Sequence, residues 1–224
     1  MTFGPPFGRC FNPPTPFFYK FNILIIMKYL ITERQLKLIK EESENDQYAG
    51  IMRIPYYMVN DNWEHLQNVI NSMGEPPYII EGDVNLRDYD IETLGSLVGV
   101  TGDLNLFYNK VIRDLGDLKF VTGELNLFGC TKLINLGNLE MVGEHLQIQY
   151  TKFRRIKDND GLNEYQLTVG GDFNCNNSDI ESLDGLKLVK GDLYLHKTPL
   201  SEKTIDVEEI RDIPNLTVEG DIFL

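Results

Sequence analysis

The stretch Val100–Gly129, VTGDLNLFYNKVIRDLGDLKFVTGELNLFG, contains nearly the same eight residues twice. VTGDLNLF begins at Val100, and VTGELNLF begins 21 residues later, at Val121. A unit this short cannot bury its own apolar side chains, but copies stacked on one another can. The repetition therefore predicts a solenoid in which each copy of the unit forms one coil.

Seven such openings occur between residues 82 and 224, each with a glycine, an acidic residue and a short apolar–polar alternation. They are GDVNL at Gly82, GDLNL at Gly102, GELNL at Gly123, GEHLQI at Gly143, GDFNC at Gly171, GDLYL at Gly191 and GDIFL at Gly220. The alternation predicts a short strand with its apolar side chains inward, and strands of consecutive coils are expected to pair in parallel. The fourth opening carries one extra residue after its glycine, which predicts a strand displaced by one position.

A second pattern, Ile-x-x-Leu-x-x-Leu-x-x-Val, runs between the openings, as at Ile91, Leu94, Leu97 and Val100. We expect these residues to line the return path of each coil. The glycine of each opening marks a corner where a side chain would clash or where φ must be positive. The predicted fold is a mainly β repeat solenoid over residues 82–224, with six to seven short coils.

Two regions precede the repeat. Residues 1–27 are rich in Pro, Gly and Phe, and Pro-Pro pairs prevent helix formation and interrupt strand pairing, so we expect an unstructured leader. The alternative is an arm whose Phe side chains dock on a partner. Residues 28–81 are expected to form a helical N-terminal cap, with its clearest helix in NDNWEHLQNVINSMG. The apolar residues on one face of that helix are Trp63, Leu66, Val69, Ile70 and Met73.

The unit L-x-x-V-x-G-D-L-N-L followed by I-x-x-L-x-x-L resembles leucine-rich repeats, most closely the short glycine-cornered variant of receptor L domains. The stack is also similar to a right-handed parallel β-helix. The resemblance covers about the last two-thirds of the chain and implies protein binding by analogy of fold. The opening MKYLITERQLKLI and the ending TPLSEKTIDVEEIRDIPNLTVEGDIFL resemble those of uncharacterised bacteriophage repeat proteins.

The chain departs from the leucine-rich-repeat pattern just after the strand. The Asn that usually ladders inside the turn is not kept, because Gly129, Asn177 and Lys197 stand in places roughly equivalent to Asn109. We therefore expect a turn built differently from that of the family.

Stacking aligns equivalent positions into three columns that point outward from the strands. The first column is acidic and comprises Asp83, Asp103, Glu124, Glu144, Asp172, Asp192 and Asp221. The second is mostly amide and comprises Asn85, Asn105, Asn126, Gln147, Asn174, Tyr194 and Phe223. The third, just past the strand, comprises Arg87, Phe107, Phe128, Gln149, Asn176 and His196.

Each column has a structural and a functional interpretation. Carboxylates beside a corner glycine commonly accept backbone N–H bonds, which is the favoured interpretation of the acidic column. The alternatives are cation binding, a basic protein partner or mimicry of DNA. The amides are expected to form ladders along the stack. Phe107 and Phe128, beside Tyr108, either anchor a partner or turn inward as core.

Composition restricts the function classes. The 224 residues carry a formal charge of −13, which disfavours binding to nucleic acid and to anionic membranes. The apolar run Phe17–Ile31 is too short to span a bilayer and is interrupted by Lys and Asn. The three cysteines and three histidines are scattered without disulfide-framework or metal-site spacing, so we expect a reducing compartment and no metal or cofactor.

No nucleophile–base–acid set and no phosphate-cradling glycine loop occur, so no catalytic residue is expected. The sequence favours a non-enzymatic protein-binding or scaffold module in the cytoplasm, the host cytoplasm for a phage-encoded chain. The alternatives are a virion component anchored by the N-terminal arm, a glycan-active β-helix enzyme and a DNA-mimicking inhibitor. The candidate partner-binding face comprises Asp83, Asp103, Glu124, Asp172, Asp192, Asn85, Asn105, Asn126, Asn174, Phe107 and Phe128.

The last strand, Gly220–Leu224, is a second candidate contact. An uncovered final coil would expose a sheet edge and apolar side chains. We expect the segment inserted before this strand to fold over the edge. The alternative is pairing with another chain, either a partner or a second copy of this one.

Overall fold

A computed structural model describes residues 48, 50–59, 62–87, 89–156, 166–204 and 206–224. The chain divides into two units, Met1–Gly50 and Ile51–Leu224, and the second unit contains nearly all of the described residues. The expected leader at 1–27 and the start of the expected cap, at 28–47, lie outside the described residues. The fold below is that of the second unit.

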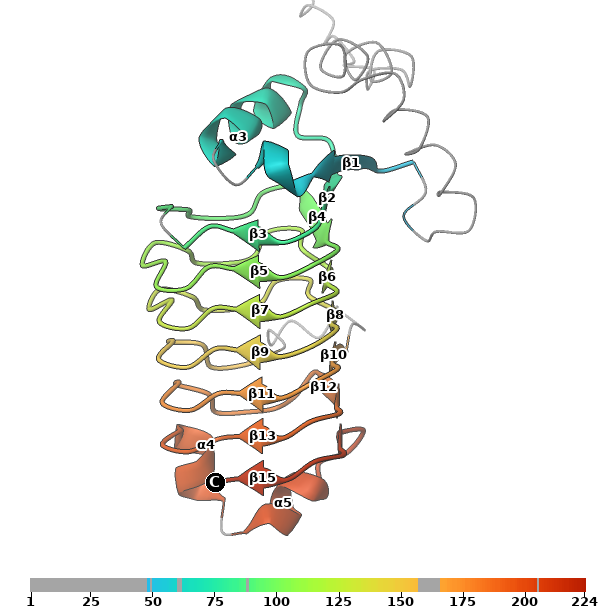
Figure 1. Cartoon of the computed structure of the whole chain (residues 1–224). Helices are drawn as coiled ribbons and strands as arrows, with labels where there is room; N and C mark the ends of the chain where they lie inside the picture. Colours follow the sequence, from blue (N-terminus) through green and yellow to red (C-terminus); the bar gives the residue numbers. More distant parts are fainter. Residues whose placement is uncertain (1–47, 49, 60–61, 88, 157–165, 205) are drawn as a thin grey trace, which may run out of the picture. The chain divides into compact units, whose positions relative to one another are not determined.

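The seven predicted strands form one parallel sheet, the smaller of two (Figure 1). They are β3 (Val84–Asn85), β5 (Leu104–Asn105), β7 (Leu125–Asn126), β9 (Leu146–Gln147), β11 (Phe173–Asn174), β13 (Leu193–Tyr194) and β15 (Ile222–Phe223). The pairing is in register from coil to coil, as in Leu104 opposite Leu125. The prediction that the Gly82, Gly102 and Gly123 segments are adjacent parallel strands is confirmed.

The larger sheet is a feature that the sequence patterns did not predict as strand. It consists of β1 (Met52–Pro55), β2 (Tyr78–Glu81), β4 (Leu97–Val100), β6 (Phe120–Val121), β8 (Met141–Val142), β10 (Leu167–Val169), β12 (Leu186–Val189) and β14 (Thr217–Val218). The valine that ends each return path lies in one of these strands and pairs with the valine of the next coil, as Val100 does with Val121. Each coil therefore contributes one short strand to each of two parallel sheets.

The region expected as a helical cap contains both helix and strand. The helix α3 (Trp63–Ser72) forms within the predicted segment and buries Trp63, Leu66 and Ile70. It begins after Asn62, and Gly74 follows it with a φ of +83°. The short 3-10 helix η1 (Tyr56–Met58) and the strands β1 and β2 belong to the same region, and both strands pair in the larger sheet.

The core runs without interruption between the two sheets. The two apolar positions of each strand in the smaller sheet point inward, as Leu104 and Leu106 do, and both side chains are fully buried. The return-path residues Leu115 and Leu118 close the same core from the other side. Burial of each such leucine contributes about 2 kcal/mol, and no coil can achieve it without its neighbours.

The corner glycines of Gly102, Gly123 and Gly191 are required for space. Their φ values lie outside the left-handed region, but a β-carbon at each would lie inside contact distance of the Asp carboxylate of the preceding coil. The corner therefore holds two coils at a separation that any larger residue would increase.

The strand of the fourth opening begins one residue later after its glycine than the other strands do, as predicted. Leu146 is three residues after Gly143, whereas Leu125 is two residues after Gly123. Leu146 lies opposite Leu125 and Val142 opposite Val121, so the corner gains no residue and Glu144 stands at the place of Gly123. The leucine ladder therefore stays buried, whereas a shift in register by one residue would move every side chain of the strand to the opposite face.

The end of the stack at β14 and β15 is partly covered by α4 (Pro199–Lys203) and α5 (Val207–Arg211) (Figure 1). Ile210 of α5 is buried. The Arg211 guanidinium donates from Nη1 to the Val218 carbonyl at 3.1 Å and from Nη2 to the Gly220 carbonyl at 3.1 Å. One coil earlier, the equivalent carbonyls of Val189 and Gly191 accept the N–H groups of Glu219 and Gly220. The Arg211 guanidinium thus donates to the two carbonyls that would otherwise accept the N–H groups of a further coil.

Replacing Arg211 by Ala is expected to lower the free energy of unfolding by about 1 kcal/mol, because two carbonyls at the sheet edge lose a charged donor. The effect should be local, with faster amide hydrogen exchange across 217–224. Arg211→Lys should recover only part of the loss, because an ammonium group lacks the forked donor geometry. Unchanged exchange in Arg211→Ala would show that the guanidinium contacts do not hold the end of the sheet.

Candidate functional site

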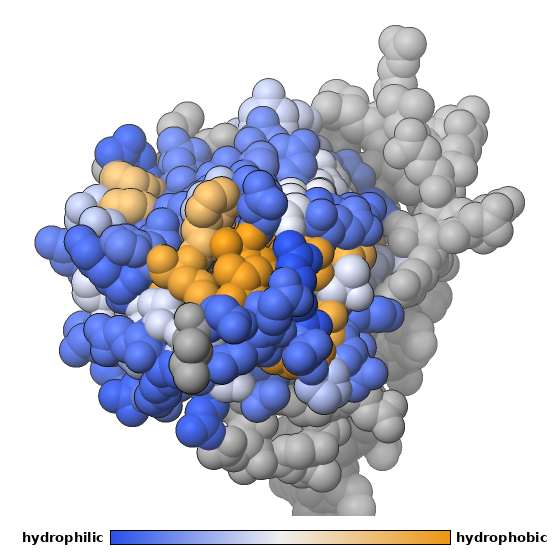
Figure 2. All heavy atoms as spheres, turned by 90° about the horizontal axis from the view of Figure 1, so that it is seen from below, coloured by the Kyte–Doolittle hydropathy of each residue, from blue (hydrophilic) through white to orange (hydrophobic). Residues whose placement is uncertain are grey.

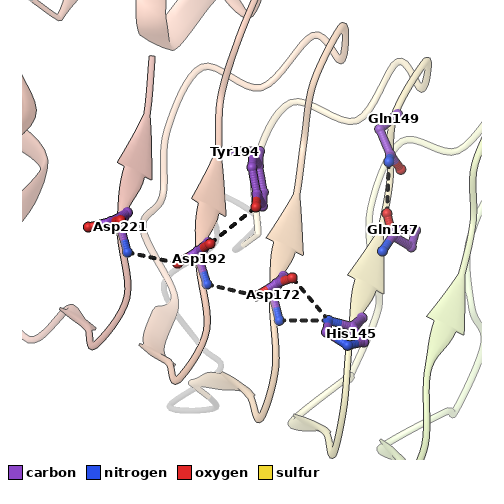
Figure 3. A network of polar contacts seen from close by, with 7 residues as sticks. All are labelled: His145, Gln147, Gln149, Asp172, Asp192, Tyr194 and Asp221. Atoms are coloured by element: carbon purple, nitrogen blue, oxygen red, sulfur yellow. Dashed lines mark hydrogen bonds and ion pairs between the residues drawn. The ribbon is translucent and has the colours of Figure 1, made fainter.

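The acidic column forms a hydrogen-bonded ladder on the outward face of the smaller sheet. Asp83 Oδ1 accepts the Asp103 N–H at 3.0 Å, and Asp103 Oδ1 accepts the Glu124 N–H at 2.8 Å. Further along, Asp172 Oδ1 accepts the Asp192 N–H and Asp192 Oδ1 accepts the Asp221 N–H, both at 2.9 Å (Figure 3). The predicted acceptance of backbone N–H groups is confirmed for these four aspartates, and the donors belong to the next coil. Glu124 differs, since its Oε1 accepts from the Asn126 side chain at 3.4 Å.

His145, and not Glu144, occupies the column in the fourth coil. Because Leu146 lies opposite Leu125, the preceding residue His145 lies beside Glu124. Its Nδ1 accepts the Asp172 N–H at 3.0 Å and lies 3.4 Å from Asp172 Oδ2 (Figure 3). The assignment of Glu144 to the acidic column is therefore wrong. The six remaining acids, called the acidic ladder below, are Asp83, Asp103, Glu124, Asp172, Asp192 and Asp221.

The end of this ladder at the last coils is strongly electronegative. The Tyr194 hydroxyl donates to Asp192 Oδ2 at 3.1 Å, and its ring stacks on Phe223 at 4.8 Å. Desolvation, together with this hydrogen bond and the charges of Asp192, Asp172 and Asp221, raises the pKa of Tyr194. A phenolate is disfavoured there because it would add a negative charge beside three carboxylates.

The amides bond within their own coils. The Oδ1 atoms of Asn105, Asn126 and Asn174 each accept the backbone N–H two residues further on, at 3.0–3.1 Å. This is the turn geometry that Asn side chains adopt locally. The expected amide ladder along the stack is wrong for these three residues. Their role is to end each strand and to orient the residue that follows.

The residues oriented in this way include an aromatic cluster on the surface. Phe107 and Phe128 stack at 5.2 Å between ring centroids, and both are half-buried. Tyr108 contacts both rings, at 4.7 and 5.6 Å, and Tyr150 contacts Phe128 at 5.1 Å. The Arg87 guanidinium lies 5.1 Å from the Phe107 centroid, within cation–π range. The two phenylalanines thus pack neither in the core nor alone on the surface. The name aromatic cluster is used below for Phe107, Tyr108, Phe128 and Tyr150.

Tyr150 is the member that sequence reasoning missed. Tyr108 and Tyr150 are about half exposed, at 51% and 52%, and both have a left-handed φ, 59° and 57°. Gly129, Asn177 and Lys197 are the left-handed residues at the same place in other coils. Aligning the coils on the leucines of the strand, and not on their glycines, would have placed Tyr150 beside Phe128.

The inward polar column lies one residue later than the sequence comparison suggested. Asn109 is only 2% exposed, donates from Nδ2 to the Tyr89 carbonyl and accepts the N–H groups of Val111 and Ile112. The equivalent side chains in other coils each donate to the carbonyl three residues before them. They are Thr151, Ser178 and Thr198. The inward position thus holds Asn in one coil and Thr or Ser in others, and the expected equivalence of Asn109 with Gly129, Asn177 and Lys197 is wrong.

Cys130 occupies this same inward column. Its thiol donates to the Leu106 carbonyl at 3.2 Å, and burial raises its pKa to about 12. A thiol of this kind is a structural donor and a poor nucleophile, since the reactive thiolate is disfavoured.

The described residues therefore place every residue of the candidate partner-binding face on the outward side of the smaller sheet. Among them we find no group of three or more His, Cys, Asp or Glu side chains positioned to hold a metal ion. No helix in the described part of the chain is long and apolar enough to cross a membrane.

Comparison with protein-family models, with curated proteins and with solved structures finds no match to this chain. Support for a parallel stack of repeated coils therefore comes from the strand pairing within this chain.

The ladder gives a direct test of the acidic column. Asp103→Ala should lower the free energy of unfolding by about 1 kcal/mol, because the Glu124 N–H loses its acceptor. Asp103→Asn keeps an acceptor oxygen and removes one charge, so its unfolding free energy should stay within about 0.5 kcal/mol of the parent. Equilibrium urea denaturation measures both. An equal loss in the two variants would mean that charge, and not the hydrogen bond, is what the column provides.

Proposed function

We propose that this chain is a protein-binding module whose contact surface is the outward face of the smaller sheet. The observation that carries the proposal is the aromatic cluster. Two half-exposed tyrosines and two half-buried phenylalanines from three consecutive coils form one contiguous aromatic surface. Large aromatic side chains dominate protein interfaces energetically, and exposed apolar patches of this kind mark binding surfaces.

The face around the cluster suits a protein partner with charges of both signs. Asp103 and Glu124 precede the phenylalanines of their coils by four residues, about 13 Å along a strand. On the other side, exposed Lys110 and Lys152 follow the tyrosines by two residues. A surface that mimics DNA would instead need uninterrupted negative charge, and the ladder is interrupted at His145.

The ladder also favours a rigid contact surface. Each carboxylate oxygen bonded to the next coil fixes the position of its charge, so little side-chain entropy is lost on binding. Preorganised polar groups of this kind contribute to specificity and association rate more than to affinity. The aromatic cluster would supply the affinity.

The finer assignments belong to the same proposal. Membership of the leucine-rich-repeat class rests on the repeated motif, and a phage origin rests on the resemblance of the opening and the ending. A cytoplasmic protein partner is the corresponding expectation, and no enzymatic activity is part of the proposal.

The test is capture of a partner by the full chain and by matched variants. Tyr108→Asn combined with Tyr150→Asn removes two rings, and Asn suits the left-handed backbone, as Asn177 shows. Ile134→Asn is the control, because Ile134 is 59% exposed and lies on the return path that follows Phe128. A captured protein should bind the double variant about thirtyfold more weakly, equivalent to about 2 kcal/mol, and the control unchanged.

Two outcomes would refute the proposal. One is a partner whose dissociation constant is the same for parent, double variant and control. The other is retention of a glycan, with no protein captured. Melting temperatures of all three chains must agree within a few degrees, so that a loss of binding is not a loss of fold.

A further inference from the structure

We propose a second docking surface, at the end of the stack formed by β14, β15, α4 and α5, which binds an extended basic segment of a partner protein. The segment would add to β15 as a further parallel strand. This surface is separate from the aromatic cluster and does not depend on it. The argument rests on the hydrogen-bonding groups of β15, on the apolar area beside it and on the charge around it.

The two sheets end differently at this surface. Arg211 occupies the outer acceptors at the end of the larger sheet and at the corner that follows it, the Val218 and Gly220 carbonyls. β15 is the outermost strand of the smaller sheet among the described residues. Its pairing with β13 uses the Asp221 and Phe223 carbonyls, as acceptors from Leu193 and Leu195. Since N–H and C=O groups alternate sides along a strand, those of Ile222 and the N–H of Leu224 face outward.

The Asp221 carboxylate, the last member of the acidic ladder, is a further hydrogen-bond acceptor at this edge. The Asp221 N–H donates to Asp192 Oδ1, as in the earlier coils. In those coils the Asp carboxylate itself accepts an N–H from the strand that follows. No described residue donates to the Asp221 carboxylate, which is therefore positioned for the backbone N–H of an added strand.

An apolar area lies beside this edge. Seen from this end, the molecule shows a central hydrophobic area surrounded by hydrophilic residues (Figure 2). Val207, Ile213 and Leu224 are partly buried residues packed against the core in this last coil, and Phe223 is 44% exposed. A segment with apolar residues at alternate positions would cover this area as each coil covers the preceding one.

The negative charge of the last coil favours a basic segment over a second copy of this chain as the occupant of this surface. The last coil carries seven acids against Lys203 and Arg211, and Arg211 is already engaged by two carbonyls. The acids are Glu202, Asp206, Glu208, Glu209, Asp212, Glu219 and Asp221. Two copies meeting at this surface would bring the same excess of negative charge together, whereas Lys or Arg at the polar positions of the segment would neutralise it.

The probe is a synthetic peptide, Ac-KGKLRLK-NH2, which copies a strand opening of this chain with basic residues in place of its polar ones. Added to the full chain, it should slow hydrogen exchange at the amides of Ile222 and Leu224, and its binding should weaken as salt increases. The same peptide N-methylated at its third and fifth residues, whose N–H groups would face Asp221 and Ile222, cannot pair with β15 and should give no protection. An acidic version, Ac-EGELELE-NH2, should also give none.

Matched variants locate the contact. Asp221→Asn keeps the acceptor and should weaken peptide binding about two- to fivefold through loss of charge, whereas Asp103→Asn should leave it unchanged. Leu224→Pro removes one outward N–H and should weaken binding further, with Leu224→Val as its control. The inference is overturned by any of three results: no protection of these amides at millimolar peptide, equal protection by the acidic peptide, or dimers of the free chain that already protect them. Loss of binding in the Tyr108 and Tyr150 variants bears only on the proposed sheet-face function, so the two proposals fail separately.

Discussion

Gly143→Ala is expected to lower the free energy of unfolding by about 2–4 kcal/mol. A β-carbon at Gly143 would lie inside contact distance of the Thr122 carbonyl oxygen and 2.8 Å from its carbonyl carbon. Both atoms are backbone of the preceding coil, so no side-chain rotation relieves the contact, and the two coils must separate. Overpacking of this kind typically costs about 1–3 kcal/mol, and weakening of the bonds from Gly143 to Val121 and from Glu144 to Gly123 adds to it.

The control for this substitution is Gly74→Ala. Gly74 has a φ of +83° and no atom within 4 Å of the place that a β-carbon would take, so alanine there costs only backbone strain, about 1 kcal/mol. Equilibrium urea denaturation of the two variants separates the free-energy cost of backbone strain, at Gly74, from that of steric overlap between coils, at Gly143. Equal losses would contradict the claim that close approach of the coils, and not glycine's conformational freedom, requires a glycine at this corner.

Asn109→Ala is expected to cost about 2–4 kcal/mol of unfolding free energy. Asn109 is 2% exposed and satisfies three backbone groups: the Tyr89 carbonyl of the preceding coil and the N–H groups of Val111 and Ile112. Alanine leaves these groups without that partner in a site closed to water, and each buried unsatisfied group costs about 1–3 kcal/mol before relaxation. The same urea measurement applies, with hydrogen exchange at Val111 and Ile112 as a local readout.

Asn135→Ala provides the matched control for that experiment. Asn135 is only partly buried, and its Oδ1 accepts one backbone N–H, from Gly137 at 2.9 Å. Its loss should cost about 1 kcal/mol or less, because water replaces the missing acceptor. If Asn109→Ala were no more costly than Asn135→Ala, the inward polar column would not be a structural requirement of the turn.

Much of the fold follows from the repeat period. The opening glycines and the L-x-L alternation predicted seven parallel strands, and all seven form one sheet in the expected order. The buried helix face of Trp63, Leu66 and Ile70 was also predicted, because its 3.6-residue spacing is local. The second sheet was not predicted, since the apolar residues leading into its strands recur every three residues and show no alternation, as at Ile91, Leu94, Leu97 and Val100.

The candidate site was only partly predictable. The acidic and amide positions could be located in every coil but the fourth, because they recur there at constant distance from a glycine. Their hydrogen-bond partners could not, since a carboxylate that accepts from its own turn and one that accepts from the next coil have the same sequence pattern. Asp103 and Asn105, two residues apart, show the difference: Asp103 bonds to the next coil and Asn105 to its own.

The periodicity of the chain is sufficient to predict coils that stack, because a twenty-residue unit has no other way to bury its leucines. Contacts between coils depend on register, and in the fourth coil the register follows the leucines of the strand and not the glycine. This register puts His145 into the ladder and brings Tyr150 against Phe128. These contacts join residues of different coils, so their energies are decided only when the coils lie against one another.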